Sequence, residues 1–243
     1  MLEYGLIGFP LSHSFSQKYF TEKFLKENID DARFLNFSIP HIEDVEQLFA
    51  EHSFLKGLAV TIPYKKSVIK YVDKTDDVVN TIAACNCIKI TNGKKAGYNT
   101  DVVGFERSFV KNLKAHHTKA LLLGTGGAAA AVKFVLDKLG IQYLNVSRNA
   151  SGKTISYDDI TPAILKEYTI IINCTPLGTY PDITEAPQLS YDLLNTSHYL
   201  FDLVYNPPLT RFLQYGKERG CIIQNGYEML VIQAEENWKI WNA

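Results

Sequence analysis

A glycine-rich turn between an apolar run and an alanine-rich stretch constrains the fold of this chain more than any other feature. The run Ala120–Leu123 is too short for a helix and is followed by glycines, so it predicts a buried parallel strand. Gly124, Gly126 and Gly127 then allow a sharp turn that exposes backbone amides, and the alanines after them predict a helix. Free N–H groups at a helix N-terminus favour an anion, which predicts a site for a diphosphate. A tight turn that binds nothing is the structural alternative.

The strand predicted after this helix, residues 143–147, ends in Ser147-Arg148-Asn149. In an NAD-binding unit an acidic residue lies about 20 positions after the glycines and accepts hydrogen bonds from the ribose hydroxyls. In this chain Ser147 and Arg148 take that place, and the next acid is Asp158. Because a guanidinium suits a ribose 2′-phosphate, the pattern favours NADP over NAD. An exposed arginine that only ends the strand is the alternative.

Bulk composition narrows the class of protein. The chain has 243 residues, 46% of them hydrophobic, and a net charge of −1. This length allows one large domain or two small ones, and the balanced charge argues against nucleic acid or an anionic membrane as partner. No apolar run is long enough to cross a bilayer, and the N-terminus lacks the pattern of a signal peptide. The cysteines, at 85, 87, 174 and 221, match neither a zinc site nor a redox pair, so they predict free thiols in the cytoplasm and no metal.

The order of predicted elements divides the chain into two α/β halves. The first half has strands near 3–8, 32–39 and 55–62, helices after a cap at Ser14 or Ser16, at 42–50 and at 64–71, and a hairpin through Asn92-Gly93. This pattern predicts a mixed sheet. After a linking helix at 102–113, strands near 120–123, 143–147, 169–173, 199–204 and 221–224 alternate with helical stretches, which is the doubly wound pattern. The last helix, 227–241, is long enough to return to the first half.

Three polar clusters in the first half carry residues suited to chemistry. They are Ser12-His13-Ser14, Val60-Thr-Ile-Pro-Tyr-Lys65 and Asn99-Thr100-Asp101. Hydride transfer to a ketone needs a proton donor for the forming alkoxide, and Lys65 or Asp101 can serve. Each also has a structural explanation, because a lysine in a helix's first turn is usually solvated and Asp101 suits an N-cap. Residue type alone leaves this choice open.

Eight motifs occur in order over nearly the whole chain. They are Tyr4-Gly-Leu-Ile-Gly-Phe-Pro-Leu-Ser-His-Ser-Phe-Ser16, Gly57-Leu-Ala-Val-Thr-Ile-Pro-Tyr-Lys65, Asn86, Gly97-Tyr-Asn-Thr-Asp101 with Gly104, Gly124-Thr-Gly-Gly-Ala128, Asn173-Cys-Thr-Pro-Leu-Gly178, Tyr205-Asn-Pro-Pro-Leu-Thr210 and Gly226-Tyr-Glu-Met-Leu-Val-Ile-Gln233. Together they resemble the motifs of the shikimate dehydrogenase family. Each motif is weak, but eight in the right order are highly specific. The resemblance implies NADPH-dependent reduction of 3-dehydroshikimate to shikimate, a step of aromatic amino-acid biosynthesis.

The resemblance also implies roles for single residues. Lys65 and Asp101 would be the catalytic pair. Ser12, Ser14 and Tyr205 would hold the substrate carboxylate, while Thr61, Lys65, Asn86, Asp101 and Gln233 would contact ring hydroxyls and the reacting oxygen. The cofactor would lie along Gly124, Thr125, Gly126, Gly127, Ala128, Ser147, Arg148, Asn173, Thr175, Leu203, Gly226 and Met229, the last three near its nicotinamide.

The predicted fold class is α/β, with a cleft between two domains. Residues 1–101, completed by the helix 227–243, would form the substrate domain, and 102–226 a Rossmann domain for NADP. We expect a small-molecule enzyme that is a monomer or homodimer. In reduction the Lys65 ammonium can donate its proton, and Asp101 keeps that ammonium charged. In oxidation Lys65 must be neutral, so which of the pair carries the proton is a coupled question.

One departure from the family pattern has a chemical consequence. The family usually has Asn, sometimes Ser, before Val-Thr, and this chain has Ala59. Loss of an amide that bonds a ring hydroxyl would weaken substrate binding by about 1–3 kcal/mol, which predicts a raised KM or a shifted substrate range. Two alternatives stay open: a quinate/shikimate dehydrogenase that uses either cofactor, and an inactive relative that only binds NADPH. A methylenetetrahydrofolate type of dehydrogenase does not explain the Ser-His-Ser loop.

Overall fold

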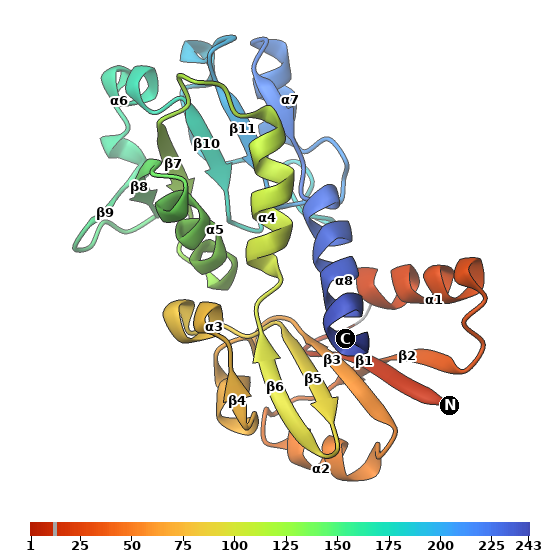
Figure 1. The fold of residues 1–243 in the computed structure, drawn as a ribbon. Coiled ribbons are helices and arrows are strands. Elements are labelled where there is room, and N and C mark those ends of the chain that lie inside the picture. The colour runs from red at the N-terminus through yellow and green to blue at the C-terminus, as the bar shows by residue number, and fades with distance from the viewer. Residues whose placement is uncertain (12–13) are drawn as a thin grey trace. The chain divides into compact units, whose positions relative to one another are not determined.

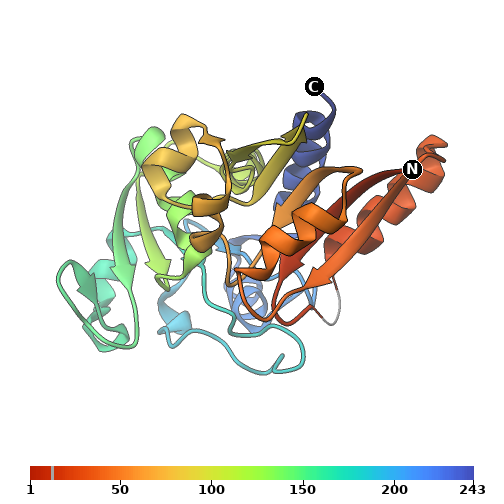
Figure 2. The same cartoon turned by 90° about the horizontal axis from the view of Figure 1, so that it is seen from below.

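The computed structural model of the protein describes residues 1–11 and 14–243. They form two compact units, Met1–Thr100 with Gln233–Ala243, and Asp101–Ile232. Each unit contains one six-stranded sheet with helices packed on it (Figures 1 and 2). Among the described residues, no helix has both the length and the apolar character that a membrane crossing requires. The bounds predicted from the sequence for a substrate domain (1–101 with 227–243) and an NADP domain (102–226) stay a prediction.

The first unit is built on a mixed sheet, as predicted. Its strands are β1 (Leu2–Gly8), β2 (Ala32–Ser38), β3 (Leu55–Val60), β4 (Lys74–Thr75), β5 (Cys87–Thr91) and β6 (Lys94–Tyr98), in the order β2-β1-β3-β5-β6-β4. The strands β2, β1 and β3 are parallel, whereas β5 is antiparallel to both β3 and β6. Asn92 and Gly93 have φ of 51° and 75° in the β5–β6 turn, which confirms the predicted hairpin.

Helices cover both faces of this sheet. They are α1 (Phe15–Glu27), α2 (Asp44–Glu51), the 3₁₀ helix η1 (Ser67–Tyr71), α3 (Asp77–Ile82) and the second part of α8 (Tyr227–Asn242). An aromatic core with Phe20, Phe24 and Trp241 packs against one face, and an aliphatic core with Val45 and Leu58 packs against the other. Figure 1 shows α1 beside β1 and β2, and the C-terminal part of α8 beside β1 and β3.

Two local predictions for this unit had different outcomes. The Ser14 hydroxyl accepts a hydrogen bond from the Gln17 amide at 3.1 Å, which confirms the predicted cap of α1. The helix predicted at 64–71 is wrong, because the Tyr64 amide bonds the Thr61 carbonyl at 2.9 Å and closes a four-residue turn with Pro63 in its third position. Lys65 therefore lies in a turn, and only a 3₁₀ helix follows from Ser67.

The second unit is the predicted doubly wound sheet. Its strands are β7 (Lys119–Leu123), β8 (Gln142–Val146), β9 (Thr154–Ile155), β10 (Ile170–Asn173), β11 (Tyr199–Asp202) and β12 (Ile222–Gln224). All pairs are parallel, in the order β9-β8-β7-β10-β11-β12. The strand order reverses between β7 and β10, and ligands of such sheets bind at this point, beyond the carboxyl ends of the strands. The two-residue β9 was not predicted.

The helices of this unit bury the apolar stripes seen in the sequence. They are α4 (Asp101–Phe109), η2 (Val110–Asn112), α5 (Gly127–Lys138), η3 (Tyr157–Asp159), α6 (Pro162–Glu167), η4 (Tyr191–Leu193), α7 (Arg211–Glu218) and the start of α8. Phe105 and Phe109 stack at 4.8 Å between ring centroids, and both contact Phe201 of β11 edge to face. The α-helix predicted at 102–113 thus begins at Asp101 and ends at Phe109, where a 3₁₀ turn continues it.

Candidate active site

The first unit gathers buried polar side chains where β5 begins and β6 ends. The Thr100 amide donates to Asn86 Oδ1 at 2.7 Å, and Asn86 Nδ2 donates to Thr100 Oγ1 at 3.1 Å. Asn86 and Thr100 are almost fully buried. Because a buried polar group must find a partner, these bonds fix both side chains in one orientation.

Helix α8 adds two amides to this network. The Thr100 hydroxyl donates to Asn237 Oδ1 at 2.7 Å, and Asn237 Nδ2 donates to Gln233 Oε1 at 3.4 Å. Gln233 was predicted to bind substrate, whereas Asn237 was missed. The available signal was its spacing of four residues from Gln233, which places both on one face of the helix.

Lys65 is held next to this network by its main chain. The Cys85 amide donates to the Lys65 carbonyl at 2.7 Å, and Asn86 is the next residue along the chain. Thr61, at the end of β3, donates its amide to the Ile7 carbonyl at 2.9 Å. Burial raises the pKa of the Cys85 thiol to about 11, and the Lys65 charge is among the groups that oppose this rise. The Lys65 ammonium therefore lies close enough to the Cys85 thiol for an electrostatic interaction between them.

The remaining residues predicted for substrate are distributed over both units. Asp101 is the first residue of α4 and follows Thr100 directly. Ser14 caps α1, and Tyr205 is half-buried, which raises the pKa of its hydroxyl and keeps it protonated. Ser12 lies outside the described residues. Lys65 belongs to the first unit and Asp101 begins the second, so their pairing stays a prediction.

In the second unit the glycine turn after β7 is open. Gly124 has φ of 96°, and a Cβ there would lie 2.8 Å from Thr175 Cγ2, so this position requires glycine. A Cβ at Gly126 or Gly127 would meet no atom within 4 Å. Gly126 starts α5 without a side-chain cap, and Thr125 through Gly127 are exposed, with Ala128 half-buried behind them. The uncapped amides of α5 are therefore available to an anion.

The end of β8 lies beside this turn. Leu123 pairs with Val146 in the register of β7 and β8, so Gly124 and Ser147 leave the sheet at adjacent points. Ser147 Oγ donates to the Asn149 carbonyl at 2.6 Å, and Arg148 is exposed. Burial raises the pKa of Tyr157, and the Arg148 charge opposes that rise, which places the guanidinium near this phenol.

A third group of predicted cofactor residues follows β10 and rests on a buried acid. Asn173 Oδ1 accepts from the Thr175 amide at 3.0 Å and from its hydroxyl at 2.6 Å. Asn173 Nδ2 donates to Asp202 Oδ1 at 2.9 Å. Asp202 also accepts from the Val204 amide at 3.0 Å and from the Thr210 hydroxyl at 2.5 Å.

Asp202 was not predicted from the sequence. It is fully buried, and burial raises its pKa to about 6 although its three side-chain and backbone donors oppose that rise. The signal that could have found it is an acid at the end of an otherwise apolar strand, Tyr199–Asp202. An acid in such a place is unstable unless several donors surround it, so it indicates a built polar cluster.

Leu203, Gly226 and Met229 complete the carboxyl edge of the sheet. The Leu203 amide donates to the Asn173 carbonyl at 3.0 Å, and Gly226 follows β12. A Cβ at Gly226 would collide with the Leu203 carbonyl, so only glycine permits this close approach. Met229 is buried in the first turn of α8. The structure therefore brings to one edge the predicted cofactor residues Gly124–Ala128, Ser147, Arg148, Asn173, Thr175, Leu203, Gly226 and Met229.

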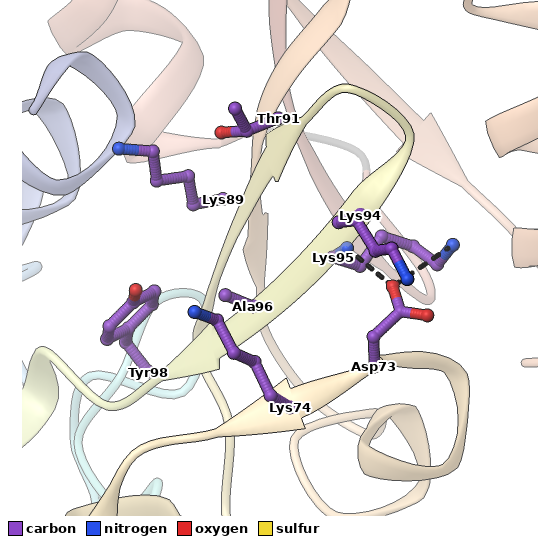
Figure 3. Close-up of a pocket in the computed structure, with 8 residues that line it drawn as sticks. All are labelled: Asp73, Lys74, Lys89, Thr91, Lys94, Lys95, Ala96 and Tyr98. Atoms are coloured by element: carbon purple, nitrogen blue, oxygen red, sulfur yellow. Dashed lines mark hydrogen bonds and ion pairs between the residues drawn. The ribbon is translucent and has the colours of Figure 1, made fainter.

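A hollow of about 570 Å³ on the first unit lies elsewhere, over β4, β5 and β6 (Figure 3). Its lining consists of Asp73, Lys74, Lys89, Thr91, Lys94, Lys95, Ala96 and Tyr98. Asp73 accepts from the Lys95 amide at 2.6 Å and faces the Lys95 ammonium at 3.8 Å. No residue predicted for substrate or cofactor lines this hollow, so its size does not locate the active site. Among the described residues no group of three His, Cys, Asp or Glu side chains could hold a metal ion.

The fold and the open glycine edge define the second unit as a Rossmann domain, joined in one chain to a mixed-sheet unit. Residues 6–88 match the family model of the shikimate dehydrogenase substrate binding domain. The chain is 39% identical to the shikimate dehydrogenase (NADP(+)) of Clostridium beijerinckii and 33% identical to that of Methanococcus vannielii. Both comparisons cover 98% of this chain, and they cover 91% and 90% of the respective relatives.

Solved structures give the same result. The shikimate 5-dehydrogenase of Listeria monocytogenes, in complex with shikimate and NAD, superposes with a TM-score of 0.86 at 26% identity, covering 100% of this chain and 92% of that one. A shikimate dehydrogenase in complex with NADP+ superposes with a TM-score of 0.86 at 30% identity, covering 99% and 90%. The chain belongs to the shikimate dehydrogenase family.

Proposed function

We propose that the protein catalyses the reversible, NADPH-dependent reduction of 3-dehydroshikimate to shikimate, a step of aromatic amino-acid biosynthesis. The observation that carries this proposal is the buried network of Asn86, Thr100 and the α8 amides, with Lys65 fixed beside it through Cys85. A polyhydroxylated ring needs several oriented donors and acceptors, and this network supplies them. Relatives that this chain matches over 90% or more of their length are named as shikimate dehydrogenases (NADP(+)), which supports the proposal.

NADP is the cofactor that the second unit fits best. The uncapped first turn of α5 offers amides to a diphosphate, and the open space around Gly126 and Gly127 admits it. Arg148 is exposed at the end of β8, and no acid occupies residues 147–149. A guanidinium there is complementary to a ribose 2′-phosphate, whereas an acid would repel it.

In this mechanism the bound NADPH supplies the hydride to the ring ketone. The Lys65 ammonium donates a proton to the ketone oxygen as negative charge develops there. Asp101 is the second member of the proposed catalytic pair, and its carboxylate orients the Lys65 ammonium in the reducing direction. Ser12, Ser14 and Tyr205 hold the carboxylate, while Thr61, Asn86 and Gln233 orient the ring hydroxyls.

We further propose that the enzyme works in the cytoplasm as a monomer or homodimer. The four cysteines are free, and three of them are buried. Burial raises the pKa of the Cys85 and Cys221 thiols to about 11, so they stay protonated and unreactive. Light scattering of the purified protein decides between one and two subunits.

The test of the proposed reaction is the absorbance of NADPH formed from NADP+ and shikimate. Parallel assays with quinate and with NAD+ separate a strict shikimate dehydrogenase from a quinate/shikimate enzyme of dual cofactor use. We expect the highest kcat/KM for shikimate with NADP+. NADPH binding without turnover on either substrate would instead identify an inactive relative and refute the proposal.

A further inference from the structure

Helix α8 lies lengthwise over β3 in the first unit. A Cβ at Gly57 would collide with the Trp241 indole, so Trp241 rests directly on Gly57. Nearer the start of the helix, Asn237 bonds Thr100 at the end of β6. Because Val60 and Asn86 are joined by a backbone bond of 2.8 Å, this end of the network lies beside the carboxyl end of β3. The helix therefore runs antiparallel to the strand.

The spacing of the two elements sets which residues face each other. Four helical residues advance about 6 Å. Two strand residues advance about 6.6 Å and return to the same face of the sheet. One step from the Gly57–Trp241 contact therefore places Asn237 over Ala59, and a second step places Gln233 near Thr61. Ala59 and Trp241 belong to one packed cluster, together with Ala234 and Cys87.

The hydrogen bonds of the Asn237 side chain leave one of its two N–H donors without a protein acceptor among the described residues. A side-chain amide has two N–H groups and a carbonyl oxygen. The oxygen accepts from Thr100 at 2.7 Å, and one N–H makes a long bond to Gln233 at 3.4 Å. Within residues 1–11 and 14–243, the second N–H has no acceptor, although Asn237 is only 1% exposed. A buried donor without a protein partner is unfavourable unless a ligand or an ordered water molecule satisfies it.

We infer that Asn237 positions the substrate, and that its second N–H donates to a ring hydroxyl from the helix, where the facing strand residue Ala59 offers no amide. The small Ala59 side chain leaves the room that the Asn237 amide occupies. This inference rests on the proposed function. It changes the consequence expected of Ala59, because the polar group missing from β3 is replaced from α8 rather than lost.

The inference predicts that positions 59 and 237 compensate each other. In Asn237→Ala we expect the KM for shikimate to rise about tenfold, as for a lost hydrogen bond in a buried site, while the KM for NADP+ stays unchanged. In Ala59→Asn/Asn237→Ala the amide returns from the strand, and we expect the KM to recover to within about threefold of the original value. Ala59→Asn alone crowds Asn237 and brings no improvement.

Controls separate substrate positioning from helix packing. Lys239→Ala changes an exposed side chain of the same helix and should leave every kinetic constant unchanged. If Asn237→Ala does not fold, Asn237→Ser keeps a small hydroxyl partner for Thr100 without the amide donor, and it should show the same rise in KM. A role confined to fastening α8 would lower the melting temperature and would not be rescued by Asn at position 59.

Two results would overturn the inference in an active enzyme. One is an unchanged KM for shikimate in Asn237→Ala and Asn237→Ser. The other is an Ala59→Asn/Asn237→Ala variant that is as impaired as Asn237→Ala alone. A wild-type protein that binds NADPH but does not oxidise shikimate would refute the proposed function itself, so the two failures are distinguishable.

Discussion

The candidate site residues of the first unit and those of the second unit differ in kind. In the first unit, buried side chains such as Asn86, Thr100 and Asn237 bond one another and occupy single orientations. In the second unit, exposed backbone at Gly126 and Gly127 faces open space. A substrate told apart by its hydroxyls requires oriented side chains, whereas a diphosphate requires room and amides. We therefore expect selectivity for the substrate ring to depend on side chains, and affinity for the cofactor to depend mainly on main-chain amides.

The second unit nevertheless has a buried polar support behind its open edge. Asp202 holds Asn173, Val204 and Thr210 with one carboxylate. These bonds fix the ends of β10 and β11, from which Thr175 and Leu203 extend. Rigid elements beneath an open edge hold the residues at that edge in fixed positions, as a preorganised binding site requires.

Removal of the proposed proton donor should have the largest effect on activity, and it should leave cofactor binding by the second unit unchanged. For Lys65→Ala we expect kcat to fall about 1000-fold, within the usual range for general acid catalysis, with NADPH affinity retained. Stopped assays with shikimate measure kcat, and NADPH fluorescence measures binding. The neighbouring Lys66→Ala is the matched control. A similar loss in both variants would remove Lys65 from the chemistry.

Neutralising the buried acid should change how stability depends on pH. The folded-state pKa of Asp202, about 6, lies above the ordinary value of 3.8. The contribution of Asp202 to the free energy of unfolding is therefore fully present below about pH 4 and is lost as the pH rises through about 6. This difference corresponds to about 3 kcal/mol. Asp202→Asn should remove this part of the pH dependence. Urea unfolding of the wild type and of Asp202→Asn at about pH 4 and about pH 8 measures this difference. The same change in unfolding free energy with pH in the two proteins would contradict the expectation.

Loss of the exposed arginine should affect only one cofactor. For Arg148→Ala we expect the KM for NADP+ to rise about 10- to 100-fold, because one charge-assisted contact to the 2′-phosphate is worth about 1.5–3 kcal/mol. The KM for NAD+ should not change. Lys153→Ala, an exposed base in the same loop, serves as the control. Equal changes for both cofactors would show that Arg148 does not read the phosphate.

Substitution of two glycines of the same turn by alanine should change different properties, stability in one case and cofactor affinity in the other. Gly124→Ala places a side chain at φ of 96° and 2.8 Å from Thr175 Cγ2, so we expect a lower melting temperature from a cost of about 1–2 kcal/mol. Gly126→Ala has φ of −68° and no neighbour within 4 Å, so stability should hold while the KM for NADP+ rises several-fold. Unchanged NADP+ affinity in Gly126→Ala would argue against a diphosphate at this helix end.

Much of the second unit could be predicted because its signals are local. The strand at 119–123, the glycine turn and α5 follow one another within 20 residues, and each depends on periodicity or backbone freedom. Where a prediction from the sequence was wrong, a hydrogen bond between nearby residues decided the local structure. Pro63 looked like the first residue of a helix, but the hydrogen bond between Thr61 and Tyr64 makes it part of a turn instead.

By itself the sequence determined the two α/β halves, the open glycine turn and the family to which the chain belongs, because strand period, turn residues and motif order are properties of consecutive residues. Only the tertiary structure decided which polar side chains share a network. Thr100 and Asn237 are 137 residues apart, and nothing local relates them until α8 packs on the sheet. The support of Asn173 by Asp202 arises in the same way, since parallel strands distant in sequence end side by side. Hydrogen bonds between buried groups act over about 3 Å in space, and the fold alone brings their partners within that distance.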